Sequence, residues 1–292
     1  MDLKPQAVSK ITVPVILERK LRGEKITCLT AYDYPTARLV DEAGIDVLLV
    51  GDTLAQVVLG YDSTVPVTSG EMLHHLRAVR RGVHRALLVA DLPYGSYHLG
   101  ERDALRTSLR FIKHGGAEAI KIEGGRKRAS LIRRMVNAEI PVVGHIGLTP
   151  QSIHRLGGYG VQGRTLESAN EVFSDAQALE DAGVFALVLE AVPRELAAMV
   201  TRRLRIPTIG IGAGPDCDGQ VLVFHDLAGL TFGPPAKFVR PYADLRQTLH
   251  DAISRFKEDV VEGRYPGDSE SYHCPAAILQ QFVKEFFAPP RA

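Results

Sequence analysis

Residues 47–52 read VLLVGD, a short apolar run that ends on a carboxylate. The pattern returns in three later segments, which read ALLVAD (86–91), AIKIE (119–123) and ALVLE (186–190). Runs of four to eight Val, Ile and Leu residues without polar alternation are typical of strands covered on both faces. Four more such runs complete the set of predicted strands, at 26–32, 141–147, 207–213 and 221–226.

Between most of these runs lie segments with helical signals. The segment 68–82 opens with Thr68 and Glu71 at capping-box spacing and closes on Gly82. Comparable helical patterns occupy 101–116, 166–183 and 193–204. Strand and helix thus alternate about eight times, in units of roughly 30 to 40 residues, which predicts a parallel sheet closed into a (β/α)8 TIM barrel. A doubly wound open sheet is the alternative, but no GxGxxG motif follows the first predicted strand.

The domain organisation follows from this pattern. We expect residues 1–274 to form the barrel as a single domain, with one irregular unit, since only PDCDGQ (215–220) separates the last two predicted strands. Residues 275–292 are expected to form a C-terminal helical extension, which carries Ile278, Phe282 and Phe286 on one face. Such a helix would pack on the barrel or on a neighbouring subunit.

Composition excludes several classes of protein. A net charge of +1 gives no electrostatic reason to expect binding to nucleic acid or to an anionic membrane. The three cysteines are widely spaced and form no CxxC motif, which disfavours a disulfide framework or a zinc site and fits a reducing cytoplasm. The N-terminal segment lacks the pattern of a signal peptide, and no apolar run is long enough for a membrane span. We therefore expect a soluble, cytoplasmic enzyme.

The acids at the strand ends predict a metal site. In a parallel barrel all strand ends share one rim, so Asp52, Asp91 and Glu123 would converge there. Three bare carboxylates so close would repel one another, and a divalent cation would resolve that repulsion. Oxygen ligands without a Cys or His cluster favour Mg²⁺ before Mn²⁺. Alternatively, each acid solvates the rim or caps a helix. For a single acid this interpretation is at least as good as metal binding, but for three acids on successive strands it is weaker.

Three further residues are candidates for the chemistry. Lys121 lies two residues before Glu123, on the same face of a central strand, where it would hold a substrate carboxylate or a developing oxyanion. His145 falls at the fifth strand end and would bond substrate, although a structural histidine is nearly as good an interpretation. Glu190, across the barrel, would act as a base or, on spacing alone equally well, cap a helix.

Several long motifs together resemble one known family. They follow one another in order from about residue 25 to residue 273, and include VGDTLAQVVLGYDSTVPVT, KIEGG, GHIGLTPQS, GGYGVQGR, IGIGAGPDCDGQVLV and YPGDSESYH. This set resembles the 3-methyl-2-oxobutanoate hydroxymethyltransferase (ketopantoate hydroxymethyltransferase) family. The resemblance implies a TIM barrel related to the phosphoenolpyruvate mutase and isocitrate lyase group, Mg²⁺ as cofactor, and a large homo-oligomer, commonly a decamer.

The resemblance also implies an activity and assigns roles to residues. A hydroxymethyl group would pass from 5,10-methylenetetrahydrofolate to 3-methyl-2-oxobutanoate, giving 2-dehydropantoate in pantothenate synthesis, through a Mg²⁺-stabilised enolate. By position, the metal-site acids match Asp52, Asp91 and Glu123, and the proton acceptor matches Glu190. The substrate contacts match Asp52, Thr53, Asp91, Lys121 and His145.

The chain also departs from the family pattern. It reads VGDTLAQ where the family usually reads VGDSLGM, so Thr53 keeps a hydroxyl but adds a methyl group, and Ala55 and Gln56 are expected to reshape the entrance. Two alternatives stay open. One is a carbon–carbon lyase of the isocitrate lyase kind, although no cysteine falls on the connection expected for its catalytic loop. The other is a barrel that binds a metabolite without catalysis.

Overall fold

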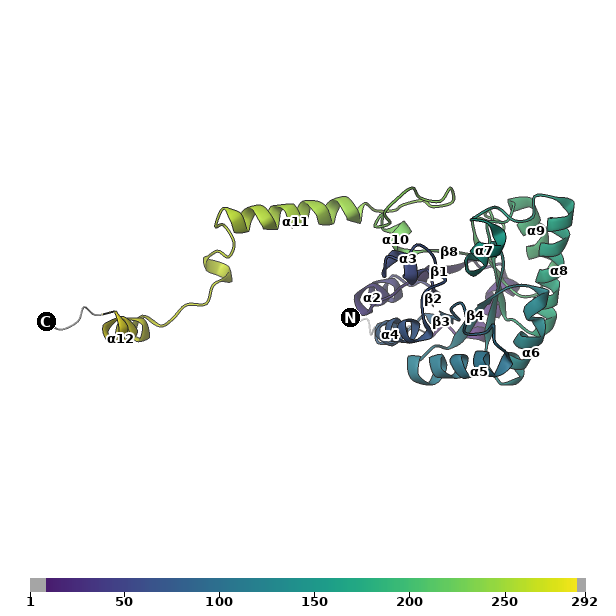
Figure 1. The fold of residues 1–292 in the computed structure, drawn as a ribbon, viewed down its shortest axis with the longest axis horizontal. Coiled ribbons are helices and arrows are strands. Elements are labelled where there is room, and N and C mark those ends of the chain that lie inside the picture. Colours follow the sequence, from purple (N-terminus) through teal and green to yellow (C-terminus); the bar gives the residue numbers. More distant parts are fainter. Residues whose placement is uncertain (1–8, 288–292) are drawn as a thin grey trace, which may run out of the picture. The chain divides into compact units, whose positions relative to one another are not determined.

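The computed structural model describes residues 9–287. Its first compact unit runs to Ala243 and its second begins at Asp244. Within the described part of the first unit, eight parallel strands pair in chain order and close into a barrel, with helices around them (Figure 1). The predicted (β/α)8 barrel is therefore confirmed. The strands are β1 (Ile26–Thr30), β2 (Val47–Val50), β3 (Leu87–Asp91), β4 (Ala119–Glu123), β5 (Val142–Gly147), β6 (Ala186–Glu190), β7 (Thr208–Ile211) and β8 (Gly219–Leu222).

Strand β8 differs from its predicted position. The sequence placed it at 221–226, but it begins at Gly219 and gives way to the short helix α10 (Phe224–Leu227). The apolar pattern did not include Gly219, yet only glycine fits there, because a Cβ atom would lie 2.4 Å from the Ile26 carbonyl oxygen. As predicted, no helix occupies the connection between β7 and β8.

The four helical segments predicted for the first unit, 68–82, 101–116, 166–183 and 193–204, all form helices. Helix α4 starts with the predicted capping box between Thr68 and Glu71. Segment 101–116 divides into α5 and a π-helical turn (Phe111–Gly115), which is capped by Gly116. No helix within residues 9–287 combines the length and the apolar composition that crossing a membrane requires. Besides α10, the α-helices in the described part of this unit are α1 (Val13–Arg22), α2 (Tyr34–Glu42), α3 (Leu54–Val57), α4 (Ser69–Arg80), α5 (Glu101–Arg110), α6 (Ala129–Asn137), α7 (Ile153–Leu156), α8 (Leu166–Ala182) and α9 (Arg194–Arg203).

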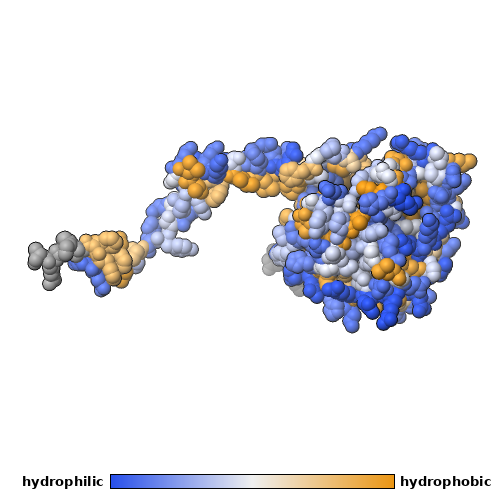
Figure 2. Space-filling model, viewed as in Figure 1, coloured by the Kyte–Doolittle hydropathy of each residue, from blue (hydrophilic) through white to orange (hydrophobic). Residues whose placement is uncertain are grey.

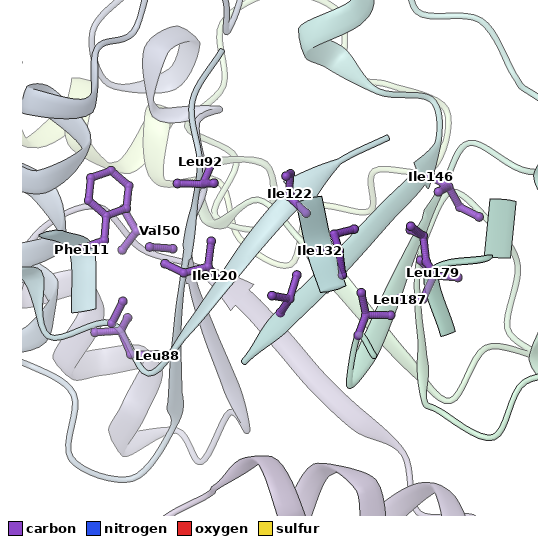
Figure 3. Packing of buried hydrophobic residues seen from close by; sticks show 14 of the residues in the cluster. Val50, Leu88, Leu92, Phe111, Ile120, Ile122, Ile132, Ile146, Leu179 and Leu187 are labelled. Atoms are coloured by element: carbon purple, nitrogen blue, oxygen red, sulfur yellow. The ribbon is translucent and has the colours of Figure 1, made fainter. Parts of the chain in front are cut away.

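Alternation along each strand separates two cores. Outward residues such as Leu88, Ile120 and Leu187 belong to a large cluster between the sheet and the helices (Figure 3). Inward residues such as Leu87 and Ala119 form a second cluster inside the barrel, which also includes Ile16 of helix α1. This two-residue period decides which strand-end side chains face the barrel axis.

Within residues 244–287, the second unit has two α-helices joined by a segment that contains a short 3-10 helix (Asp268–Glu270). They are α11 (Leu245–Val261) and α12 (Ala276–Phe286), and both expose apolar side chains (Figure 2). The chain divides into compact units at 243/244, whereas the sequence placed a boundary at 274/275, and α11 buries none of its residues. The ends of the two predicted domains, 1–8 and 288–292, lie outside the described residues.

Candidate active site

Five of the predicted site residues share the inward face of the barrel at its C-terminal end. On β4, Lys121 and Glu123 follow the inward-facing Ala119 at two-residue intervals. On β3, β5 and β6 the same period carries three more side chains to this end, those of Asp91, His145 and Glu190. We call these five residues the central cluster. All are buried except Glu190, whose side chain is 15% exposed.

The contacts inside the central cluster run from strand to strand around the barrel. Lys121 Nζ lies 2.9 Å from Asp91 Oδ1 and 3.3 Å from His145 Nδ1. His145 Nδ1 is 3.5 Å from Glu123 Oε1, while its Nε2 is 3.1 Å from Glu190 Oε2. Four consecutive strands thus place an ammonium group, an imidazole and three carboxylates within direct reach of one another. The sequence placed Glu190 across the barrel from the other acids, and the structure brings it within reach of them through His145.

Gln151 connects Asp52 to the central cluster. Its side-chain amide donates to Asp52 Oδ2 at 2.8 Å and to the Leu92 carbonyl at 2.9 Å, while its backbone N–H donates to Glu123 Oε2 at 3.1 Å. The amide oxygen accepts a hydrogen bond from the hydroxyl of Tyr97. Because these groups are buried, the network fixes the orientation of two of the predicted metal-site carboxylates. Sequence reasoning missed Gln151, although it lies in the quoted motif GHIGLTPQS.

Burial makes the charges of this site interdependent. Burial and the neighbouring carboxylate of Asp91 raise the pKa of Asp52 to about 7. Burial, followed by the charge of Asp52, also raises the pKa of Glu123 well above its usual value. Burial would lower the pKa of Lys121, but Asp91, Glu123 and Asp52 outweigh it and hold that pKa above its usual value. The single positive charge of Lys121 therefore cannot neutralise all three of these carboxylates.

His145 is neutral in this environment. Burial and the charge of Lys121 lower the pKa of His145, against the opposing effect of Glu190. Because an ammonium group can only donate, Nδ1 of His145 accepts from Lys121 and the ring proton resides on Nε2. Although Nε2 is close to Glu190, it has no hydrogen bond of good geometry within the described residues. It is therefore a donor that can bond a substrate oxygen.

The donor atoms of this site suit a hard cation without enclosing one. Among residues 9–287, no three His, Cys, Asp or Glu side chains stand together closely enough to hold a metal ion. Magnesium sites, however, usually take one or two carboxylates and complete the octahedron with water and substrate. Asp91 Oδ1 is buried and has no partner in the described chain beyond its ion pair with Lys121. Oxygen donors with raised pKa values and excess negative charge fit Mg²⁺. The binding of Mg²⁺ by all three acids, Asp52, Asp91 and Glu123, stays a prediction.

The three positions that depart from the family pattern have different surroundings. Thr53 precedes helix α3 and is half-buried, and within the described residues its hydroxyl makes no hydrogen bond. Ala55 is fully buried in the core between sheet and helices, and its expected effect on the entrance stays a prediction. Gln56 is half-buried and donates to the Asp62 carbonyl at 3.2 Å.

The backbone around Glu190 is tightly constrained. Gly147 has a φ of 88°, and a Cβ atom there would lie 2.3 Å from the Glu190 carbonyl oxygen. Ala191 has a φ of 47°, which is unusual for a residue with a side chain. Such conformations persist where the surrounding structure enforces them, often beside functional groups. The close contact requires glycine at the end of β5, and the strain at Ala191 was not visible in the sequence.

Comparison with known sequences identifies close relatives. A sequence profile described as Ketopantoate hydroxymethyltransferase matches residues 10–268. The protein named 3-methyl-2-oxobutanoate hydroxymethyltransferase from Koribacter versatilis is 63% identical over 267 residues, which cover 91% of this chain and 90% of the relative. Its namesake from a Thermoanaerobacter species is 51% identical over 263 residues, covering 90% of this chain and 96% of the relative.

Comparison with solved structures agrees on the fold. A phosphonopyruvate hydrolase in complex with oxalate and Mg²⁺ superposes with a TM-score of 0.58 at 13% identity, covering 94% of this chain and 98% of that chain. A 2,3-dimethylmalate lyase, a member of the PEP mutase/isocitrate lyase superfamily, gives 0.57 at 20% identity, covering 93% and 94%. At these identities the likeness concerns the barrel alone.

Proposed function

The chain belongs to the ketopantoate hydroxymethyltransferase family, and from this membership we propose that it transfers a hydroxymethyl group from 5,10-methylenetetrahydrofolate to 3-methyl-2-oxobutanoate, giving 2-dehydropantoate. The observation that carries the proposal is the central cluster, where an ammonium group, a neutral imidazole and several carboxylates meet at the C-terminal end of the barrel. Active sites of such barrels lie at this end. The reaction removes a proton from C3 of the oxo acid, so it requires a base and stabilisation of negative charge, and these residues supply both.

Glu190 is the proposed base. Its side chain is the most accessible of the central cluster, and it makes no ion pair with Lys121. Its carboxylate can therefore take the proton from C3 of the oxo acid, a role in which a positioned base contributes roughly 10²–10⁴-fold. The backbone constraints at Gly147 and Ala191 hold this strand end in place.

Lys121 and His145 would bind the oxygen atoms of the oxo acid. Lys121 carries the positive charge that balances the charge developing on the substrate oxygen, and the buried site strengthens that attraction. His145 donates from Nε2, the ring nitrogen without a good protein partner. A Mg²⁺ ion held by Asp52, Asp91 and Glu123 would act as a Lewis acid that stabilises the same enolate charge. Gln151 orients Asp52 and Glu123 for that role.

The assembly and cellular location are also proposed from the family. We expect a homo-oligomer, with a decamer as the commonest family form, that works in the cytoplasm. The exposed apolar side chains of α12, which include Ile278, Phe282 and Phe286, support an assembly in which a second copy covers them. Sedimentation velocity of the full chain would give the number of subunits.

The test of the function is direct. The purified protein is incubated with Mg²⁺, 3-methyl-2-oxobutanoate and 5,10-methylenetetrahydrofolate, and 2-dehydropantoate is measured by mass spectrometry. We expect product that depends on all three additions. Cleavage of a carbon–carbon bond in a malate-type substrate would support a lyase instead, and oxo-acid binding without turnover would support a metabolite-binding barrel.

A further inference from the structure

A large cavity opens beside the central cluster. It has a volume of about 880 Å³ and is lined by the loops that follow three consecutive strands, β3, β4 and β5. Glu123 and Gln151 lie in its wall, so it reaches the place where the oxo acid is proposed to react. Cavities of this size accommodate a ligand as large as a drug molecule. A small oxo acid would leave most of it free.

Two basic side chains in the cavity wall are unpaired. Lys127 follows β4 and Arg155 follows β5, and both are exposed. Within residues 9–287, neither side chain takes part in a hydrogen bond or an ion pair. Their neighbour Arg126, in contrast, bonds Asp175 at 2.9 Å. Although Glu171 of α8 also lines the cavity, two cations from different loops remain available to an anionic ligand.

The loop that follows β3 supplies aromatic side chains to the same cavity. The rings of Tyr94 and His98 are exposed, with centroids 4.6 Å apart. The ring of the buried Tyr97 has its centroid 4.3 Å from that of His98. The guanidinium carbon of Arg128 lies over the Tyr97 ring, 4.9 Å from its centroid. Because the Tyr94 and His98 rings are tilted by 49° from one another, the exposed ring of Tyr94 offers the stacking face for a flat heteroaromatic ligand, with His98 beside it.

We propose that this cavity binds the one-carbon carrier, with its pterin ring against Tyr94 and His98 and its glutamate carboxylates on Lys127 and Arg155. This inference rests on the proposed function. A reduced folate combines a flat heterocycle with a dicarboxylate tail, and the cavity combines an aromatic wall with unpaired cations. Because the cavity meets the central cluster at Glu123, a carrier bound there can bring its one-carbon unit to the oxo acid.

The experiment measures carrier binding apart from turnover. Calorimetry follows 5-methyltetrahydrofolate, which has no transferable methylene bridge, as it binds the full chain in the presence of Mg²⁺ and the oxo acid. The double variant Lys127→Glu/Arg155→Glu is expected to bind this probe about tenfold more weakly than the unmodified chain, because two attractions become repulsions. Added salt should weaken binding to the unmodified chain more than to the variant.

A matched control makes the same change of charge at two exposed positions outside the cavity. Lys113→Glu/Arg203→Glu reverses two exposed cations that do not line the cavity, and binding should stay within twofold of the unmodified chain. Equal affinity in both double variants would overturn the inference, and so would the absence of binding to the unmodified chain. Product formation is measured alongside. If the unmodified chain makes 2-dehydropantoate while Lys127→Glu/Arg155→Glu keeps full affinity, the inference fails but the proposed function stands.

Discussion

The two halves of the barrel interior are built from the same strands but have opposite chemistry. In the N-terminal half, the inward positions of β3 and β4 are Leu87, Val89 and Ala119, which pack with Ile16 of helix α1. In the C-terminal half, the next inward position on β3 is Asp91, and β4 continues with Lys121 and Glu123. One step of the two-residue period therefore separates an apolar core from a charged cluster.

This difference separates stability from chemistry along each strand. Burial of apolar surface in the N-terminal half favours folding, whereas burial raises the pKa values of Asp52 and Glu123 and so disfavours their charged forms in the other half. A site that holds unfavourable charge needs a stable scaffold beneath it. Changes in the charged half should therefore affect catalysis first, and changes in the apolar half should affect stability first.

The largest effect on activity is expected for Glu190→Gln. The amide keeps the size of the side chain but cannot take a proton, so deuterium exchange at C3 of the oxo acid should fall by roughly 10²–10⁴-fold. Exchange is followed by proton NMR in deuterated buffer, and oxo-acid binding should be retained. Exchange at the unmodified rate would remove Glu190 from the role of base.

A smaller loss is expected for Gln151→Ala. This change frees Asp52 from the side-chain amide while the backbone bond to Glu123 remains. Groups that orient metal ligands typically contribute 10–100-fold to metal affinity, so Mg²⁺ should bind about tenfold or more weakly by calorimetry. Gln220→Ala is the matched control, because the side chain of Gln220 bonds only the Gly214 carbonyl within the described residues. Equal losses in both variants would exclude a positioning role for Gln151.

The pH dependence of Mg²⁺ binding tests the charged half without mutation. A raised pKa means that the carboxyl holds its proton at higher pH, and the pKa of Asp52 is raised to about 7. Because a proton competes with the metal, the apparent dissociation constant should rise below pH 7, by at most about tenfold per pH unit for one such group. Titrations at pH 6, 7 and 8 would reveal it, and an affinity that does not change with pH would contradict the assignment.

The smallest effect on activity is expected for Leu87→Ala, in the apolar half. Leu87 is 2% exposed, and truncation of such a residue typically lowers the free energy of unfolding by about 2–5 kcal/mol. Denaturant unfolding should show this loss, while kcat at a temperature where the variant is folded should match the unmodified chain. A fall in kcat as large as the loss of exchange expected for Glu190→Gln would contradict the distinction between the two halves.

Much of the contrast between the apolar half and the charged half of the barrel could be predicted from the sequence, because it depends on local periodicity. The spacing of Lys121 and Glu123 placed both on one face of a strand, and the parallel strands then brought Asp91, His145 and Glu190 to the same end. Gly219 escaped the apolar pattern because its place in β8 depends on a close approach to β1, which only the folded chain reveals.

Other features depend on contacts between distant segments. Gln151 meets Asp52 across 99 residues of sequence, and no periodic pattern marks a polar residue in a loop. The cavity is likewise formed only when three loops come together. The boundary at 243/244 also has no counterpart in the sequence pattern, because a helical pattern such as that of α11 does not show whether the helix buries its residues.

The most direct measurement is the position of a bound metal ion. Crystals of the full chain grown with Mn²⁺ in place of Mg²⁺ and with 3-methyl-2-oxobutanoate would locate the ion by its anomalous scattering. We predict a single peak at the C-terminal end of the barrel, within coordination distance of at least one carboxylate of Asp52, Asp91 or Glu123 and in contact with the oxo acid. A peak elsewhere, or an oxo acid bound away from Lys121 and His145, would contradict the account.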